Sequence, residues 1–281
     1  MKILIIGATG NAGSNAIEAL KAKGVRPTAA VRDIKKAKAK LGDDTDYVFF
    51  DYLDKSTYDA ALKGVNKLFF IAPPPKKDPA IARELMEAVQ KAGIDFVLFQ
   101  SGGTSGTYKG KPLYQIEQDL RNSDANICII RPAWYMQNFH TWLGTTLEDD
   151  EICLPTGEAK VAYFDLKDLG IAIAEILTTD GHVDKIYSLT GAKAIGFDEV
   201  AAAIGEASGR ETKYRDMTNE GYVNKMVEKG WSADAAKYCI WLYDRVKAGS
   251  EEEVTGDFKN IVGSEPTSFA EFARREFGQK K

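Results

Sequence analysis

The chain has 281 residues, with 37 Lys and Arg against 41 Asp and Glu, and a formal net charge of -4. This length suffices for one large domain or two modest ones with buried cores. The balance of charges argues against nucleic acid as the main partner. No apolar run approaches the roughly 18 residues that span a bilayer, and the run after Lys2 is too short for a signal peptide. We therefore expect a cytoplasmic protein with neither a nucleic-acid nor a membrane partner.

Cysteine and histidine usage argues against a metal site or a disulfide framework. The cysteines, Cys128, Cys153 and Cys239, are odd in number and share no CxxC spacing, and His140 and His182 are the only histidines. We therefore expect no bound metal, and cysteines that are buried or inert thiols.

Short apolar runs alternate with stretches of helical spacing, a pattern typical of a parallel sheet built from βαβ units. The runs predict strands at residues 3–6, 28–31, 47–50, 67–72, 96–100, 127–131 and 186–189. The helical spacing predicts helices at residues 15–23, 34–41, 56–62, 80–92 and 115–122.

The turn GATGNAG lies between the first predicted strand and the first predicted helix. Its glycines are spaced three apart, at Gly7, Gly10 and Gly13. Backbone N–H groups and the helix dipole favour a pyrophosphate at such a turn, and glycine permits the close approach of a phosphate. The small residues Thr9, Asn11 and Ala12 leave room for that ligand. A glycine triplet alone is weak evidence, but its place between strand and helix favours dinucleotide binding over a purely structural turn.

These features predict an α/β fold of the Rossmann type, a doubly wound parallel sheet with a smaller, mostly helical C-terminal substrate lobe. The strand–helix alternation loosens after Arg131, and helical spacing with charged faces dominates from Phe197 onward. We expect the nucleotide-binding domain to take residues 1–132 and about 158–191. The substrate lobe would then take residues 133–157 and 192–281.

The end of the second predicted strand favours NADP(H) over NAD(H). Arg32 stands where enzymes that use NADP place a cation for the 2′-phosphate, and Lys36 follows closely. Asp33 suits the N-cap of the next helix. The alternative, with Asp33 turned to the ribose of NAD, stays open. Asp51, at the end of the third strand, is placed to meet the adenine, although an Asp that caps the next turn would look the same.

Four stretches resemble one known family: GATGNAG with VRD, then FVLFQSGG, RPAWYMQNF, and the tail VTGDFKNIVGSEPTSFAEFA. The chain resembles, over nearly its whole length, the NmrA-like branch of the atypical short-chain dehydrogenases. Within it, NAD(P)H:quinone oxidoreductases and festuclavine dehydrogenases are closest in kind. The resemblance implies an oxidoreductase that transfers hydride from NADPH to a conjugated quinone, enone or iminium. Other members are NADP-sensing regulators without catalysis, and this alternative stays open.

The resemblance also implies catalytic residues. Ser101 follows the strand FVLFQ, where short-chain dehydrogenases place a serine beside the nicotinamide, and Tyr114 stands thirteen residues later as the candidate acid. Catalytic members carry a lysine four residues after that tyrosine, which lowers the phenol pKa, but here this residue is Gln118. A neutral amide cannot replace the cation, so the departure argues against a conventional Tyr–Lys reduction. Lys109 or Lys111 could help only if the loop folds back.

Quinone and iminium reduction depend more on positioning than on a strong acid. An aromatic wall would suit a flat, conjugated small molecule, although packing of the core is the alternative for at least half of the aromatic residues. The residues expected to bind such a substrate are Tyr108, Trp134, Tyr135 and Asn138. Those expected to bind the cofactor are Gly7, Thr9, Gly10, Asn11, Ala12, Gly13, Arg32, Lys36, Asp51, Ala72, Pro73, Ser101 and Pro132. We expect a monomer or a homodimer.

Overall fold

The computed structural model describes residues 1–73, 78–103 and 108–278, and contacts divide the chain into two compact units. The first unit comprises residues 1–132, 166–189 and 257–264, and the second comprises residues 133–165, 190–256 and 265–281. Two segments differ from the ranges expected above. Residues 158–165 lie in the second unit, where Val161 pairs with Ile195, and residues 257–264 lie in the first, where Asp257 accepts a hydrogen bond from Ser188 N.

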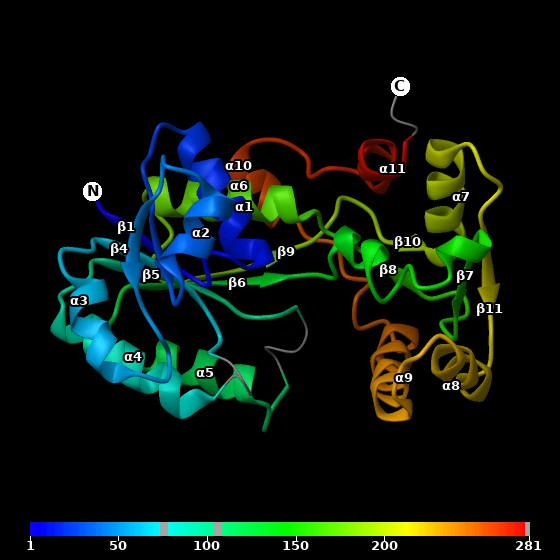
Figure 1. The fold of residues 1–281 in the computed structure, drawn as a ribbon, viewed down its shortest axis with the longest axis horizontal. Coiled ribbons are helices and arrows are strands. Elements are labelled where there is room, and N and C mark those ends of the chain that lie inside the picture. The colour runs from blue at the N-terminus through cyan, green and yellow to red at the C-terminus, as the bar shows by residue number, and fades with distance from the viewer. Residues whose placement is uncertain (74–77, 104–107, 279–281) are drawn as a thin grey trace. The chain divides into compact units, whose positions relative to one another are not determined.

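A parallel sheet forms the middle layer of the first unit (Figure 1). Within the described residues it has seven strands, in the order β3-β2-β1-β4-β5-β6-β9. They are β1 (Ile3–Ile6), β2 (Thr28–Val31), β3 (Asp46–Phe49), β4 (Lys67–Ile71), β5 (Phe96–Gln100), β6 (Ile127–Pro132) and β9 (Lys185–Leu189). The central strand β1 is buried along its whole length. Burial on both faces is why the inner strands β2, β1, β4, β5 and β6 read as apolar runs, whereas the edge strands β3 and β9 are partly exposed.

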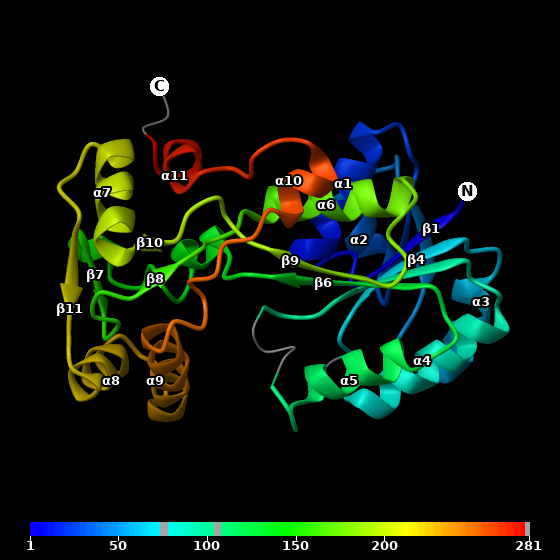
Figure 2. The same cartoon turned by 180° about the vertical axis from the view of Figure 1, so that it is seen from behind.

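Helices cover both faces of this sheet (Figures 1 and 2). One face carries α1 (Asn11–Ala22), α2 (Ile34–Leu41), α6 (Leu166–Thr178) and α10 (Asp257–Val262). The other carries α3 (Tyr58–Leu62), α4 (Pro79–Lys91) and α5 (Pro112–Arg121), and the short 3-10 helix η1 (Lys55–Thr57) precedes α3. The strand order and the helices on both faces confirm the predicted doubly wound fold.

Helix α6 is an element that the sequence analysis did not predict. It packs against α1 so closely that a Cβ added to Gly170 would lie 2.4 Å from the carbonyl oxygen of Asn15. Nine residues of α6 are buried, including Ala172 and Leu177. Because apolar residues surround most of this helix, its sequence lacks the one-sided spacing that marks a surface helix.

The remaining boundaries differ from the predicted ones by a few residues. Helix α1 begins at Asn11 rather than Asn15, because its first turn consists of polar or small residues that carry no apolar period. Helix α5 begins at Pro112 rather than Gln115, with Pro112 in its first turn. The helix predicted at residues 56–62 is divided into η1 and α3. The strands at residues 3–6, 28–31 and 96–100 and the helix at residues 34–41 are confirmed to the residue.

The second unit is mostly helical and has its own apolar core. Its helices are η3 (Met136–His140), η4 (Leu147–Asp149), α7 (Phe197–Ser208), α8 (Asn219–Glu228), α9 (Ala233–Lys247) and α11 (Phe269–Phe277). Its strands are β7 (Glu151–Leu154), β8 (Lys160–Val161), β10 (Ile195–Gly196) and β11 (Lys213–Asp216). Figure 2 shows β7 beside β11, a parallel pair, and α8 beside α9. Tyr163, Phe197 and Phe269 pack edge-to-face or tilted at the centre of the core.

Among the helices of the described residues, none combines the length and the apolar character needed to cross a lipid bilayer. The three cysteines are buried free thiols, as predicted.

Candidate functional site

The glycine-rich turn joins β1 to α1 in a conformation that depends on its glycines. Gly7 has a φ of +82°, a region that other residues rarely adopt, and its carbonyl oxygen accepts a hydrogen bond from Gly10 N at 2.9 Å. A Cβ on Gly13 would lie 2.3 Å from that same oxygen. The first turn of α1 therefore packs directly on the loop, and only glycine fits at residue 13 without a shift of the backbone.

The N-terminus of α1 is open to a ligand. Its N-cap, Gly10, offers no side chain to the first N–H groups, and no acidic residue lies in the first turn. Thr9, Gly10 and Asn11 are exposed, whereas Ala12 and Gly13 are buried. Free N–H groups at a helix start, together with the helix dipole, bind anions such as a pyrophosphate.

Beside this turn, the end of β2 and the start of α2 form a basic pocket. A volume of about 680 Å³ is lined by Thr9, Val31, Arg32, Asp33, Lys36, Ala37 and Lys40. The carboxylate of Asp33 accepts a hydrogen bond from Lys36 N at 2.9 Å, so Asp33 is the N-cap of α2, as predicted. The pocket thus holds three cations, from Arg32, Lys36 and Lys40, and one carboxylate that is hydrogen-bonded to the helix backbone.

Lys40 is a pocket residue that the sequence analysis missed. Its Nζ donates a hydrogen bond to the carbonyl oxygen of Thr9 at 2.8 Å, which ties α2 to the glycine-rich turn. Lys36 and Lys40 are four residues apart and share one face of the helix. The four-residue spacing could have indicated that Lys40 lies beside Lys36. It was missed because lysines also stand at positions 35 and 38, so the helix is basic on several sides.

Asp51 lies after β3, and its side chain takes part in a local turn. Its Oδ1 accepts a hydrogen bond from Leu53 N at 3.0 Å, and its own N–H donates to Thr57 Oγ1 at 3.2 Å. The turn-capping geometry is therefore present. The contact of Asp51 with adenine stays a prediction.

The carboxyl ends of β4, β5 and β6 place Ser101, Pro73 and Pro132 at one edge of the sheet. Ser101 N donates to Ile130 O and Gly103 N donates to Pro132 O, both at 2.9 Å, so the backbone pairing continues past the strand ends. Ser101 is 6 % exposed, and its Oγ has no hydrogen-bond partner among the described residues. A buried hydroxyl without a partner is costly, and a bound polar ligand would satisfy it.

Tyr114 and Gln118 lie one turn apart on α5, and both are partly buried. Within the part of the chain that the structure describes, neither side chain has a hydrogen-bond partner. Lys109 and Lys111 are exposed. The residues on α5 next to Tyr114 thus supply no lysine to tune its phenol.

Glu117, which lies between Tyr114 and Gln118 on α5, makes a buried ion pair that was not predicted from the sequence. Its side chain is completely buried and accepts two hydrogen bonds from the guanidinium of Arg131, one of them from Nε at 3.0 Å. The Arg131 side chain is itself 19 % exposed. This bidentate pair fixes α5 against the end of β6, next to Pro132.

In the second unit, the predicted substrate residues follow β6 along the segment RPAWYMQNF. Trp134 packs edge-to-face on Trp142 with ring centroids 5.1 Å apart, and both rings are partly exposed. The backbone of Tyr135 forms an isolated parallel β-bridge with that of Phe164. The side-chain amide of Asn138 has no hydrogen-bond partner within the described ranges, whereas its backbone holds the following turn through Thr141 N and Leu143 N.

A completely buried carboxylate, Asp165, is hydrogen-bonded to the segment RPAWYMQNF. It accepts hydrogen bonds from Gln137 Nε2 and from Arg275, both at 2.7 Å. Gln137 belongs to the segment and Arg275 to the C-terminal helix α11, so Asp165 links the segment to that helix. In the first unit, Tyr108 is partly buried. Its contact with a substrate stays a prediction, as does that of the three residues in the second unit.

The family model for the NmrA-like family matches residues 1–273. The chain belongs to the NmrA-like family. The NAD(P)H azoreductase of Xenophilus azovorans is 28 % identical over 276 residues, which cover 97 % of this chain and 96 % of that protein.

Solved structures of the family agree with the fold. The NADPH-dependent quinone oxidoreductase QOR2 of Escherichia coli, complexed with NADPH, has a TM-score of 0.88 at 25 % identity and covers 98 % of this chain and 100 % of its own. The triphenylmethane reductase of Citrobacter sp., complexed with NADP(H), has a TM-score of 0.85 at 26 % identity, with 98 % and 99 % covered. All three are named as reductases or oxidoreductases, and each name or structure includes NADPH, NADP(H) or NAD(P)H.

Proposed function

We propose that the protein is an NADPH-dependent oxidoreductase that reduces a conjugated small molecule, such as a quinone. The observation that carries the proposal is the pocket of Arg32, Lys36 and Lys40 beside the open N-terminus of α1. Three cations against one carboxylate, which is held by the backbone of α2, suit a phosphate dianion, the group that distinguishes NADPH from NADH. The named reductases of the family use cofactors of this class.

The residues at the edge of the sheet also fit the cofactor. The glycine-rich turn and the first N–H groups of α1 would hold the pyrophosphate. Ser101 Oγ, buried and without a partner, would hydrogen-bond the nicotinamide end. When bound, NADPH would supply a hydride to the acceptor. The protein would orient both molecules and exclude water.

The residues on α5 favour an acceptor that needs no strong protein acid. Tyr114 has Gln118, and not a lysine, one turn away, so α5 places no cation beside its phenol. A quinone takes up a hydride without a strong acid, because the charge spreads over two conjugated oxygens. We propose that Tyr108, Trp134, Tyr135 and Asn138 contact such an acceptor through aromatic faces and one amide.

The proposal is tested by measuring NADPH oxidation with a panel of quinones, enones and iminium compounds, after the cofactor affinity has been determined by titration. We expect at least one flat conjugated acceptor to be reduced in proportion to the amount of protein. If NADPH binds tightly and no compound of the panel is reduced, the reductase proposal fails. The NADP-sensing regulator without catalysis then takes its place.

We expect the change Tyr114→Phe to leave the turnover of a quinone within about tenfold of wild type. A tuned general acid typically contributes 10²- to 10⁴-fold, and Tyr114 lacks the cation that would tune it. Steady-state kinetics at saturating NADPH measure the effect. A loss beyond a hundredfold at unchanged cofactor affinity would show that Tyr114 is a true acid, served by a lysine from positions 109–111.

The change Trp134→Ala is expected to lower acceptor turnover more than tenfold, because hydride transfer depends on a well-oriented acceptor. NADPH affinity should not change, since Trp134 lies in the second unit. Trp241→Ala, at an exposed tryptophan on α9 of the same unit, is the matched control and should retain activity. Equal activities of the two variants, with both folded by circular dichroism, would remove Trp134 from the substrate site.

A further inference from the structure

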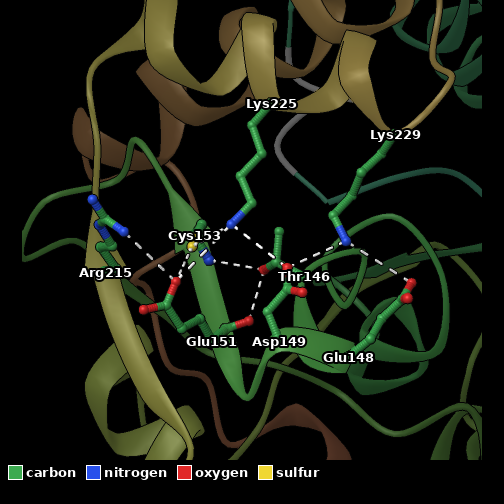
Figure 3. Close-up of polar contacts among 8 residues, drawn as sticks. All are labelled: Thr146, Glu148, Asp149, Glu151, Cys153, Arg215, Lys225 and Lys229. Atoms are coloured by element: carbon green, nitrogen blue, oxygen red, sulfur yellow. Dashed lines mark hydrogen bonds and ion pairs between the residues drawn. The ribbon is translucent and has the colours of Figure 1, made fainter.

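The second unit holds a polar cluster around the thiol of Cys153, on strand β7 (Figure 3). Lys225, from helix α8, donates a hydrogen bond from Nζ to Cys153 Sγ at 3.2 Å. On the other side, the thiol donates to Glu151 Oε2, also at 3.2 Å. One sulfur therefore contacts both an amine and a carboxylate.

The backbone holds this thiol in one place. Cys153 N donates to Thr146 Oγ1 at 3.0 Å, and that hydroxyl donates to the carbonyl oxygen of Glu151 at 2.7 Å. Cys153 is 1 % exposed, but the side chains of Lys225 and Glu151 are 24 % and 33 % exposed. The sulfur itself is buried, and it lies between two side chains that both reach solvent (Figure 3).

The other two cysteines lack this arrangement. Burial alone raises the pKa of Cys128 to about 12, and burial also raises the pKa of Cys239, which lies against Tyr222. Within the described part of the chain, neither sulfur contacts an amine. Burial and Glu151 raise the pKa of Cys153, while Lys225 acts in the opposite direction. The resting thiol of Cys153 is therefore protonated, with a proton acceptor and a stabilising cation both in contact.

We propose that Cys153 and Lys225 are an oxidation-dependent modification site, at which a hydroperoxide joins the two side chains through a sulfur–nitrogen bond. The thiol proton passes to Glu151, and the thiolate attacks the peroxide and breaks its O–O bond. Sulfur is oxidised to the sulfenic acid, and the released hydroxide takes the proton from Glu151 and leaves as water.

The second step needs no further oxidant. Lys225, after its ammonium has lost a proton to solvent, attacks the sulfur. The S–N bond forms, the S–O bond breaks, and the hydroxyl leaves as a second water with a proton from the amine. One thiol, one amine and one hydrogen peroxide thus give one sulfenamide and two waters. The bond would tie β7 to α8 within the second unit, and it does not depend on the proposed reductase activity.

The experiment treats the full-length protein with hydrogen peroxide, digests it without reductant and identifies linked peptides by mass spectrometry. We expect one cross-linked pair, joining residues 153 and 225 and lighter than the two peptides by two hydrogens. Dithiothreitol should reverse it. Cys128 and Cys239 should stay free thiols under the same conditions.

Two lysine variants make the test specific. Lys225→Arg keeps the positive charge but cannot form the same bond, so the cross-link should vanish while the fold, followed by circular dichroism, is retained. Lys229→Gln is the matched control: Lys229 is the C-cap residue of α8, four positions after Lys225, and it contacts Asp149 at 3.3 Å rather than the sulfur, so its loss should leave the cross-link intact. A wild-type Cys153 that stays unmodified, or goes to the sulfinic acid without linkage to Lys225, overturns the proposal.

Discussion

Replacement of Arg32 by alanine is expected to lower the affinity for NADPH by about 10- to 150-fold and to leave the affinity for NADH unchanged. The estimate follows from the roughly 1.5–3 kcal/mol that a hydrogen bond to a charged group contributes. Arg32 lines the basic pocket together with Lys36 and Lys40. Isothermal titration calorimetry with both cofactors, on the wild type and the variant, measures the preference and its loss.

Lys35→Ala is the matched control for this prediction. Lys35 is an exposed cation next to Lys36, but it does not line the pocket, so its loss should change the preference little. Equal affinity of the wild type for NADPH and NADH would contradict the assignment of Arg32. It would mean that Asp33 leaves its position as N-cap and faces the ribose when the cofactor is bound.

Replacement of Glu117 by alanine is expected to have the largest effect on stability. Glu117 is completely buried, so its removal leaves the mostly buried guanidinium of Arg131 without a partner. Breaking a buried ion pair from one side costs about 3–5 kcal/mol of unfolding free energy. Urea unfolding should show a clear fall of the midpoint. The double variant Glu117→Leu, Arg131→Met should recover much of the loss, because no buried charge remains.

Asp119→Ala tests whether burial of the ion pair is the cause of the large loss of stability expected for Glu117→Ala. Asp119 lies on the same helix and pairs with Arg83 at 2.8 Å, but the two side chains are 23 % and 52 % exposed. A surface pair of this kind contributes under about 1 kcal/mol. If Glu117→Ala and Asp119→Ala unfold at the same urea concentration, the pair with Arg131 does not stabilise the end of β6 as argued.

Local sequence patterns predicted the sheet and the glycine-rich turn because their causes are local. The inner strands of the first unit are buried on both faces and therefore read as apolar runs, and the turn needs glycine at Gly7 for its positive φ. Asp33 was recognised as a helix cap for the same reason, since a cap depends on its immediate neighbours.

The features that the sequence did not predict depend on contacts between distant residues. Asp165 and Arg275 are 110 positions apart, and the pair of β7 and β11 joins residues about 60 positions apart. Glu117 reads as a surface charge on an amphipathic helix, because a sequence shows that a residue is charged but not that it is buried. Lys40 belongs to the basic pocket because the folded chain brings α2 against the turn at Thr9.

The central claim is that the protein transfers a hydride from NADPH to a conjugated acceptor, and a single-turnover experiment tests it most directly. The preformed complex with NADPH is mixed with an excess of a naphthoquinone, and the absorbance of the reduced nicotinamide is followed. We predict that the absorbance decays in one turnover, and that it decays several times more slowly when both hydrogens at the reactive carbon of the nicotinamide are deuterium. An absorbance that persists with every acceptor of the panel, or a decay that deuterium does not slow and that is equally fast without protein, would contradict the account.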